Sequence, residues 1–234
     1  MNYSNVEWKK KSVFITRDLE PDSIFLTALQ HAGFDVFGKS LIEFETISFE
    51  KFPKTDWIFF YSQNAVRFFE KGLSKKDKTA IFEHTCLGTI GESTANLTKL
   101  LFKKCDFTGN GDPKTTAEAF LKIAKDKRVL FPHAENSRQS IQKLLSGEIY
   151  DFDLVVYKNH PRKDLSLPDF EVLVFTSPMN VDAYLSKKKF LKNQTIISIG
   201  QTTAQALKEY GINNIITSRK PSELNLANAV KNAF

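Results

Sequence analysis

The sequence predicts an α/β protein made of two similar parallel-sheet lobes, one of them discontinuous. Short apolar runs alternate with helical patterns along the whole 234-residue chain, which is typical of the α/β class. These runs show little alternation with polar residues, so both faces of each strand are expected to be covered, as in parallel sheets. A duplicated pattern of strand, turn and helix then predicts two lobes rather than one large sheet.

The strands are predicted from runs rich in β-branched and aromatic residues, such as Trp57–Phe60 and Val172–Phe175. In chain order these runs cover 12–16, 41–47, 56–61, 86–90, 128–132, 153–158, 171–176, 195–199 and 214–217. The helices are predicted from amphipathic spacing after Ser, Thr, Asp or Asn start signals. They cover 22–32, 64–71, 94–102, 115–125, 137–145, 181–187, 203–210 and 223–231.

An internal repeat is the most informative feature of the sequence. Residues 57–69 are similar to residues 172–184, and residues 89–97 are similar to residues 198–207. Each copy predicts a strand, a Ser turn and a helix, followed by a strand, a Gly–Thr turn and another helix. Two copies imply two similar lobes.

The two copies are placed differently in the chain. The second copy leaves too few residues after it to complete a lobe, and the N-terminal run Val13–Arg17 resembles Val129–His133 in position and character. We therefore predict a discontinuous lobe of residues 1–42 plus 160–234, with a lobe of residues 43–159 inserted into it. The chain would cross between lobes near Ile42 and Asn159, and two thin crossings are suited to a hinge.

Composition narrows the possible partners and compartment. The formal net charge of +6 is modest and spread along the chain, and no basic helix with interleaved aromatic residues predicts a nucleic-acid groove. No apolar run approaches the ~20 residues of a membrane span, and the polar segment 1–11 does not resemble a signal peptide. The two cysteines, Cys86 and Cys105, form no disulfide framework, which favours a reducing, cytoplasmic location.

Four turns are predicted at the carboxyl ends of strands, where parallel sheets bind ligands. Ser62 and Ser177 follow the strands of the first repeat and suit helix N-caps. Gly91 and Gly200 follow the next strand in each lobe, and the Ser and Thr residues after them, which include Thr94 and Thr203, are expected to cap helices. Free N–H groups at such helix starts attract carboxylate or phosphate. The alternative is that these turns are only helix caps.

Further candidate residues lie close to predicted strand ends. Arg17 follows the first strand, and Arg138 is placed at the start of a helix; an Arg side chain suits carboxylate recognition, although each could equally be a solvated surface residue. Tyr157, near the second crossing, could act as a weak acid or remain an ordinary strand tyrosine. The four histidines lack metal-ligand spacing, and neither a phosphate loop nor a dinucleotide fingerprint is present.

The chain resembles the uroporphyrinogen-III synthase family nearly end to end. The resemblance rests on Val13–Arg17, on the paired turns at 61–66 and 175–181, and on the two Ile-Gly-x-x-Thr-Ala turns at 90–95 and 199–204. It also rests on Leu130-Phe-Pro with Arg138 and on Val155-Val-Tyr157. No one of these motifs is specific, but their number, order and spacing are.

The resemblance implies two flavodoxin- or Rossmann-like lobes joined by a two-stranded connector. It implies a cofactor-free lyase that acts on hydroxymethylbilane, a linear tetrapyrrole with eight carboxylates, removing its hydroxyl as water, inverting the last pyrrole ring and closing the macrocycle. It places Tyr157 as the residue that assists loss of the hydroxyl. It also implies substrate contacts from the turn and basic residues, which are Arg17, Ser62, Gly91, Thr94, Arg138, Ser177, Gly200 and Thr203. The turn Tyr61-Ser62-Gln63 departs from the family's usual Thr-Ser.

Two other functions stay open on the sequence. A non-catalytic, two-lobed module that binds an anionic metabolite would share the architecture, but it would not need an acid such as Tyr157. A nucleotide-dependent enzyme is disfavoured because the phosphate loop is missing. The expected partners are the polycarboxylate substrate and the preceding enzyme of the pathway, without a metal, nucleic acid or membrane, and a monomer is expected.

Overall fold

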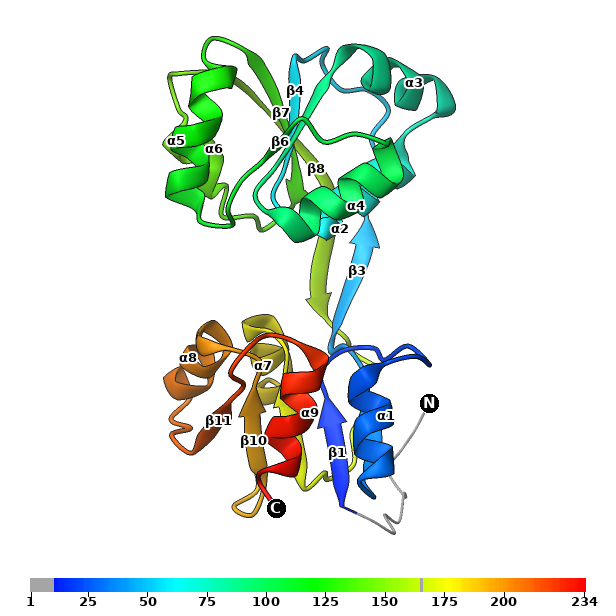
Figure 1. The fold of residues 1–234 in the computed structure, drawn as a ribbon, viewed down its shortest axis with the longest axis vertical. Helices are drawn as coiled ribbons and strands as arrows, with labels where there is room; N and C mark the ends of the chain where they lie inside the picture. Colours follow the sequence, from blue (N-terminus) through cyan, green and yellow to red (C-terminus); the bar gives the residue numbers. More distant parts are fainter. Residues whose placement is uncertain (1–10, 165) are drawn as a thin grey trace. The chain divides into compact units, whose positions relative to one another are not determined.

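The computed structural model describes residues 11–164 and 166–234, so the predictions made for the N-terminal segment up to residue 10 lie outside it. The chain divides into two compact units. Unit 1 contains the chain up to Glu43 and from His160 onward, and unit 2 is Phe44–Asn159. Both are α/β units in which strands and helices alternate (Figure 1). The predicted α/β fold class with two parallel-dominated sheets is confirmed.

Unit 2 is built around the strands in the order β8-β7-β4-β5-β6, all parallel to their neighbours. Its strands are β4 (Trp57–Phe60), β5 (Cys86–Thr89), β6 (Phe107–Thr108), β7 (Arg128–Ala134) and β8 (Tyr150–Pro161). Its helices are α2 (Gln63–Gly72), α3 (Lys75–His84), α4 (Glu92–Phe102), α5 (Pro113–Ala124) and α6 (Ser140–Leu144). β4, the most buried strand, follows from four consecutive large apolar residues that are covered on both faces.

Unit 1 repeats this arrangement with a different chain order. Its sheet runs β2-β1-β9-β10-β11, again parallel throughout. Its strands are β1 (Ser12–Ile15), β2 (Asp35–Gly38), β9 (Val172–Phe175), β10 (Thr195–Ser198) and β11 (Ile215–Thr217). Its helices are α1 (Ile24–His31), α7 (Pro178–Leu185), α8 (Gln201–Glu209) and α9 (Glu223–Lys231). The N-terminal strand β1 thus lies between β2 and β9, the latter from the distant C-terminal part of the chain.

Each sheet is covered by helices on both faces, and the side chains of successive strand residues alternate between the two cores. In unit 2, α2 and α4 cover one face, while α5 and α6 cover the other. In unit 1, α7 and α8 cover one face, and α1 and α9 lie side by side on the other (Figure 1). Burying the apolar side chains of both faces contributes about 25 cal/mol per Å² of area removed from water, which is the main stabilising term of each unit.

Two strands carry the chain between the units. β3 (Ile42–Thr46) pairs with β8, and both cross the boundary between unit 1 and unit 2. The N–H of Ile47 donates to the carbonyl of Val156, and the N–H of Arg162 donates to the carbonyl of Leu41, so the pair is antiparallel. The crossing positions therefore form a two-stranded ribbon rather than two independent linkers.

Two strands and one helix of the structure were not predicted from the sequence. β2 is a short strand ending in Gly38, β6 has two residues, and α3 is a lysine-rich helix without a buried stripe of its own among the residues that the structure describes. The other differences concern ends. The helix predicted over 137–145 shortens to α6, and the one predicted over 94–102 begins at Glu92.

Candidate functional site

Ser62 begins α2 at the carboxyl end of β4, as the sequence predicts. Its backbone is extended, and its Oγ accepts a hydrogen bond from the N–H of Ala65 at 3.2 Å. This bond satisfies one of the donors that a helix start leaves free. Ser62 therefore has a structural function as an N-cap, and its hydroxyl hydrogen remains available for a second partner.

That second partner is Tyr157, which lies on β8 and is 6% exposed. Its ring stacks on Phe68 of α2 with 4.8 Å between ring centroids and 18° between ring planes. Phe44 of β3 packs against both rings, at 5.9 Å from Tyr157 and 6.2 Å from Phe68. The sequence-predicted Ser62 and Tyr157 are thus brought together within unit 2, in a cluster of three aromatic rings.

The surroundings of Tyr157 favour its protonated form. Burial raises the pKa of the Tyr157 phenol, while the hydrogen bond with Ser62 acts in the lowering direction without cancelling the rise. The phenol therefore carries its proton at neutral pH, and it lies beside the Ser62 hydroxyl. A protonated phenol is one of the groups that act as general acids.

The glycine turn of unit 2 corrects one sequence prediction. Gly91 is itself the N-cap of α4, in an extended conformation and without any side-chain cap, so Thr94 lies inside the first helical turn and does not cap it. Helix α4 starts directly after β5, two residues earlier than predicted. The carbonyl of Gly91 accepts the N–H groups of Thr94 and Ala95 at 3.2 and 3.0 Å, and the Thr94 side chain is buried.

The glycine turn of unit 1 repeats this geometry. Gly200 is the extended N-cap of α8, again without a side-chain cap, and Thr203 is buried within the first turn rather than capping it. The first backbone bond of α8 runs from the N–H of Ala204 to the carbonyl of Gly200 at 3.0 Å. Within the described part of the chain, the N–H groups of residues 201–203 have no acceptor. They could hold a carboxylate.

Ser177 caps α7 at the carboxyl end of β9. Its Oγ accepts the N–H of Asn180 at 3.2 Å and the side-chain amide of the same residue at 2.8 Å. The Asn180 Oδ1 in turn accepts the N–H of Leu41 at 2.8 Å. Ser177 is therefore joined to an amide that holds the start of the connector, whereas its counterpart Ser62 is joined to a phenol.

Arg17 lies just past the carboxyl end of β1, as predicted, but it is not a free cation. Its guanidinium is 3.7 Å from Glu223, the first residue of α9, with the Arg17 side chain 42% exposed. Burial acts to raise the pKa of Glu223, but hydrogen bonds from Phe25 N–H and the Ser23 hydroxyl, together with Arg17, hold it below its ordinary range. Arg17 retains further N–H donors for a ligand.

Arg138 is placed differently from the prediction. It lies in the loop before α6, because Gln139 adopts a left-handed conformation (φ 52°) that delays the helix start to Ser140. Its side chain is exposed, and it has no ion-pair partner among residues 11–164 and 166–234. A substrate contact from Arg138 stays a prediction.

Two phenylalanines that pack against Tyr157, Phe44 and Phe68, were not among the predicted site residues. A signal was present for Phe68, since Ala65, Val66 and Phe69 form the buried stripe of α2 and Phe68 is the apolar residue outside it. For Phe44 no comparable signal existed, because its exposure of 40% depends on where the connector leaves unit 2.

Two classes of feature are absent from the described residues. No group of three or more His, Cys, Asp or Glu side chains could hold a metal ion there, and no described helix is both long and apolar enough to cross a membrane.

The chain is similar to known proteins over most of its length. The family model described as uroporphyrinogen-III synthase HemD matches residues 24–228. The porphyrin biosynthesis protein HemD of Ruminiclostridium josui is 24% identical over 229 residues, which cover 88% of this chain and 45% of that protein. The chain thus spans about half the length of that curated relative.

Two solved structures share the fold. The uroporphyrinogen-III synthetase of Helicobacter pylori 26695 has a TM-score of 0.74 at 24% identity, covering 96% of this chain and all of that one. A mutant uroporphyrinogen III synthase of Thermus thermophilus has a TM-score of 0.58 at 14% identity, covering 95% of this chain and 97% of that one. The resemblance inferred from the sequence is confirmed: the chain belongs to the uroporphyrinogen-III synthase family of enzymes.

Proposed function

We propose that this protein converts hydroxymethylbilane to uroporphyrinogen III, without a cofactor, in tetrapyrrole biosynthesis. The observation that carries the proposal is the family match over residues 24–228. The surroundings of Tyr157 support it, because burial raises the pKa of this phenol and so keeps it protonated beside Ser62. A protein that only bound an anionic metabolite would not need a group that protonates a departing hydroxyl.

The main task of the protein in this reaction is to position the substrate so that the correct carbon of the last ring reacts. A hydroxymethylpyrrole can lose water to give an azafulvenium cation, and the last ring must then react through its substituted carbon, by way of a spiro intermediate, for the ring to be inverted. In the proposed mechanism Tyr157 donates its proton to the departing hydroxyl, which leaves as water. The protein then holds the cation so that the substituted carbon attacks and the free carbon does not.

The turn residues and arginines are proposed to hold the substrate's carboxylates. The open amides after Gly200 and those after Gly91 supply N–H donors, and Thr94 and Thr203 lie buried in the first turns of these helices. The other proposed donors are the capped turns at Ser62 and Ser177 and the guanidinium groups of Arg17 and Arg138. Each of these groups is a hydrogen-bond donor, which matches a ligand with eight carboxylates.

The compartment, the oligomeric state and the source of the substrate are part of the same proposal. The protein is proposed to act in the cytoplasm as a monomer and to receive its unstable substrate from the preceding enzyme of the pathway. The two free cysteines suit a reducing compartment.

One assay tests the function. Hydroxymethylbilane generated enzymatically is supplied to the purified protein, and the isomer of the oxidised product is identified by chromatography. The type III isomer is expected at a rate proportional to the protein concentration. Accumulation of the spontaneous type I isomer alone would rule out the synthase activity, and tight binding of the tetrapyrrole without turnover would favour the binding module.

A further inference from the structure

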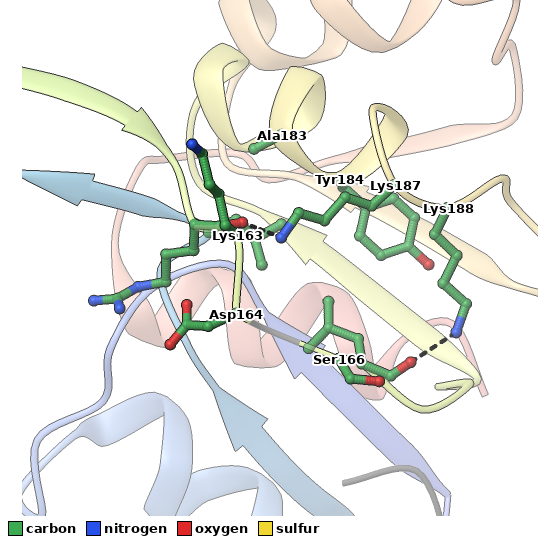
Figure 2. A pocket seen from close by; sticks show the side chains of 10 residues that line it. Lys163, Asp164, Ser166, Ala183, Tyr184, Lys187 and Lys188 are labelled. Atoms are coloured by element: carbon green, nitrogen blue, oxygen red, sulfur yellow. Dashed lines mark hydrogen bonds between the residues drawn. The ribbon is translucent and has the colours of Figure 1, made fainter. Parts of the chain in front are cut away.

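Unit 1 contains a pocket that no part of the proposed reaction uses. It has a volume of about 510 Å³ and lies beside the C-terminal half of α7 (Figure 2). Aliphatic side chains, among them Leu41 and Leu167, form part of its wall. The polar part of the wall includes Arg162, Tyr184, Lys187 and Lys188.

Tyr184 contributes a buried hydrogen-bond donor. The residue is 2% exposed, and its ring stacks on Phe190 with 5.3 Å between centroids and 16° between planes. Burial raises the pKa of Tyr184 to about 12, and a hydrogen bond from Gln194 opposes that rise. The protonated phenol is therefore a buried hydrogen-bond donor in the wall of the pocket.

The Gln194 amide is itself held in one orientation. Its Oε1 accepts the N–H of Leu191 at 2.8 Å, and its Nε2 donates to the carbonyl of Phe170 at 2.8 Å. Both polar atoms of the Gln194 amide are therefore engaged by the backbone, next to the Tyr184 phenol.

Arg162 adds a second buried donor. Its Nε is buried and has no hydrogen-bond partner among the residues that the structure describes. The outer end of the guanidinium lies 3.6 Å from Glu43, so the charge is partly balanced while the Nε–H is not satisfied. A buried donor left without an acceptor is costly, which indicates that a bound group supplies one.

The two lysines are held at the rim of the same pocket. The Nζ of Lys187 donates to the carbonyl of Arg162, and the Nζ of Lys188 donates to the carbonyl of Leu167 at 3.0 Å. Lys188 also pairs with Asp169 at 2.6 Å. The carboxylate of Asp164, which belongs to the wall, points away from Tyr184 and Lys188 in Figure 2. Each ammonium carries three donors, so both lysines retain capacity for a ligand.

We propose that this pocket binds a carboxylate carried on a short aliphatic chain. The donors from Tyr184, Arg162 and the lysines match an acceptor-only anion, and the walls at Leu41 and Leu167 match a hydrocarbon arm. The pocket is separate from the turn at Ser177, because α7 extends for roughly 12 Å, at 1.5 Å per residue, and the two features lie at its opposite ends. The proposal does not depend on the synthase activity.

Calorimetric titration of the purified full-length protein with glutarate tests the proposal. We expect saturable binding that weakens about tenfold in Tyr184→Phe, which removes only the hydroxyl, and in Lys187→Gln. Lys189→Gln is the matched control, because it removes the same charge from a neighbour outside the pocket and should bind as the wild type does. Lys187 is exposed, so its variant remains informative if Tyr184→Phe is poorly folded.

Three outcomes would overturn the proposal: no binding by the wild type, equal weakening in all three variants, or inorganic phosphate binding more tightly than glutarate. A second measurement distinguishes the sources of the carboxylate. If the variants raise KM for hydroxymethylbilane while keeping kcat, the arm belongs to the tetrapyrrole. If KM is unchanged and glutarate binding is lost, the pocket serves a separate small carboxylate. Lack of synthase activity in the wild type would reject the proposed function and leave the titration result intact.

Discussion

The two glycine turns have the same local backbone but different surroundings. Gly91 and Gly200 are both extended N-caps without a side-chain cap. A Cβ at Gly91 would lie 3.3 Å from the Cα of Gly111, whereas a Cβ at Gly200 would have no heavy atom within 4 Å among the described residues. The loop that follows β6 folds close to the turn in unit 2, and no described loop of unit 1 approaches its turn in the same way. A repeated motif therefore yields one covered turn and one open turn.

The two serine turns differ in chemistry rather than in access. Ser62 is bonded to the phenol of Tyr157, while Ser177 is bonded to the amide of Asn180. Unit 2 thus places a buried phenol beside its cap, and unit 1 places beside its cap an amide that holds the start of the connector. Duplication has preserved the cap and changed its partner, so the units are expected to respond differently to matched substitutions.

Tyr157→Phe should have the largest effect on activity. Removing the proposed proton donor is expected to lower kcat by about 10- to 100-fold, which is at or below the lower limit of general-acid effects, because the hydroxyl can also leave unaided. KM should change little. Steady-state kinetics with Tyr150→Phe as the control checks this, since Tyr150 lies on the same strand and is 63% exposed. Full activity in Tyr157→Phe would remove the acid function.

The paired variants Ser62→Ala and Ser177→Ala should separate capping from chemistry. Each loses an N-cap and is expected to lower the free energy of unfolding by about 1 kcal/mol, as measured by urea denaturation. Only Ser62→Ala should also lower kcat severalfold, because it removes the hydrogen bond that orients the Tyr157 phenol. Equal kinetic losses in both variants would show that the two serine turns are not functionally different.

The glycine pair tests whether the open turn receives a ligand. Gly200→Ala should leave the free energy of unfolding nearly unchanged, because the loss of a favourable cap residue and the gain from a stiffer unfolded chain are each under about 1 kcal/mol and opposed. KM should nevertheless rise severalfold, since the new methyl group enters the space beside the free amides. Gly91→Ala should be the less stable protein, through contact with Gly111. An unchanged KM in Gly200→Ala argues against substrate binding there.

The smallest expected effect concerns the ion pair of unit 1. The pKa of Glu223 in the folded protein lies below its unfolded value, so its stabilising contribution is present above about pH 4.3 and is lost as the pH falls through the folded pKa. Glu223→Gln should therefore cost less than about 1 kcal/mol at pH 7, because its partner Arg17 is 42% exposed, and nothing at strongly acid pH. Urea denaturation at both pH values checks this, with the exposed Glu118→Gln of unit 2 as control.

Much of the fold follows from local pattern. The strands at Trp57–Phe60 and Val172–Phe175 were predictable because four large apolar residues in succession are covered on both faces of a parallel sheet. β2 was not, since its four half-buried residues end in glycine and are held by long-range contacts: the pairing with β1 and the stacking of Phe37 on Phe14 and Phe170. Helix α3 offered a capping-box signal at Ser74 and Asp77, but its lysine-rich sequence lacks a strong apolar stripe.

The sequence predicted where along the chain the candidate site residues lie, but it did not predict which of them are in contact. Ser62, Ser177, Gly91 and Gly200 lie at strand ends, as the repeat indicates. The start-signal rule misplaced α4 and α8, because a helix that follows its strand directly uses the glycine itself as the cap. Contacts such as Tyr157 with Ser62 join residues far apart in the chain, and no local pattern reveals such a pairing.

The central position of β1 has a consequence for how the chain is made. Val13 pairs with Val172, so the middle of one sheet needs residues synthesised far apart in time. Unit 2 can close once Asn159 has left the ribosome, whereas the N-terminal part of unit 1 must wait until β9 emerges. During translation the apolar edge of β1 therefore stays unpaired until β9 is made, and unit 1 is expected to be the later of the two units to fold.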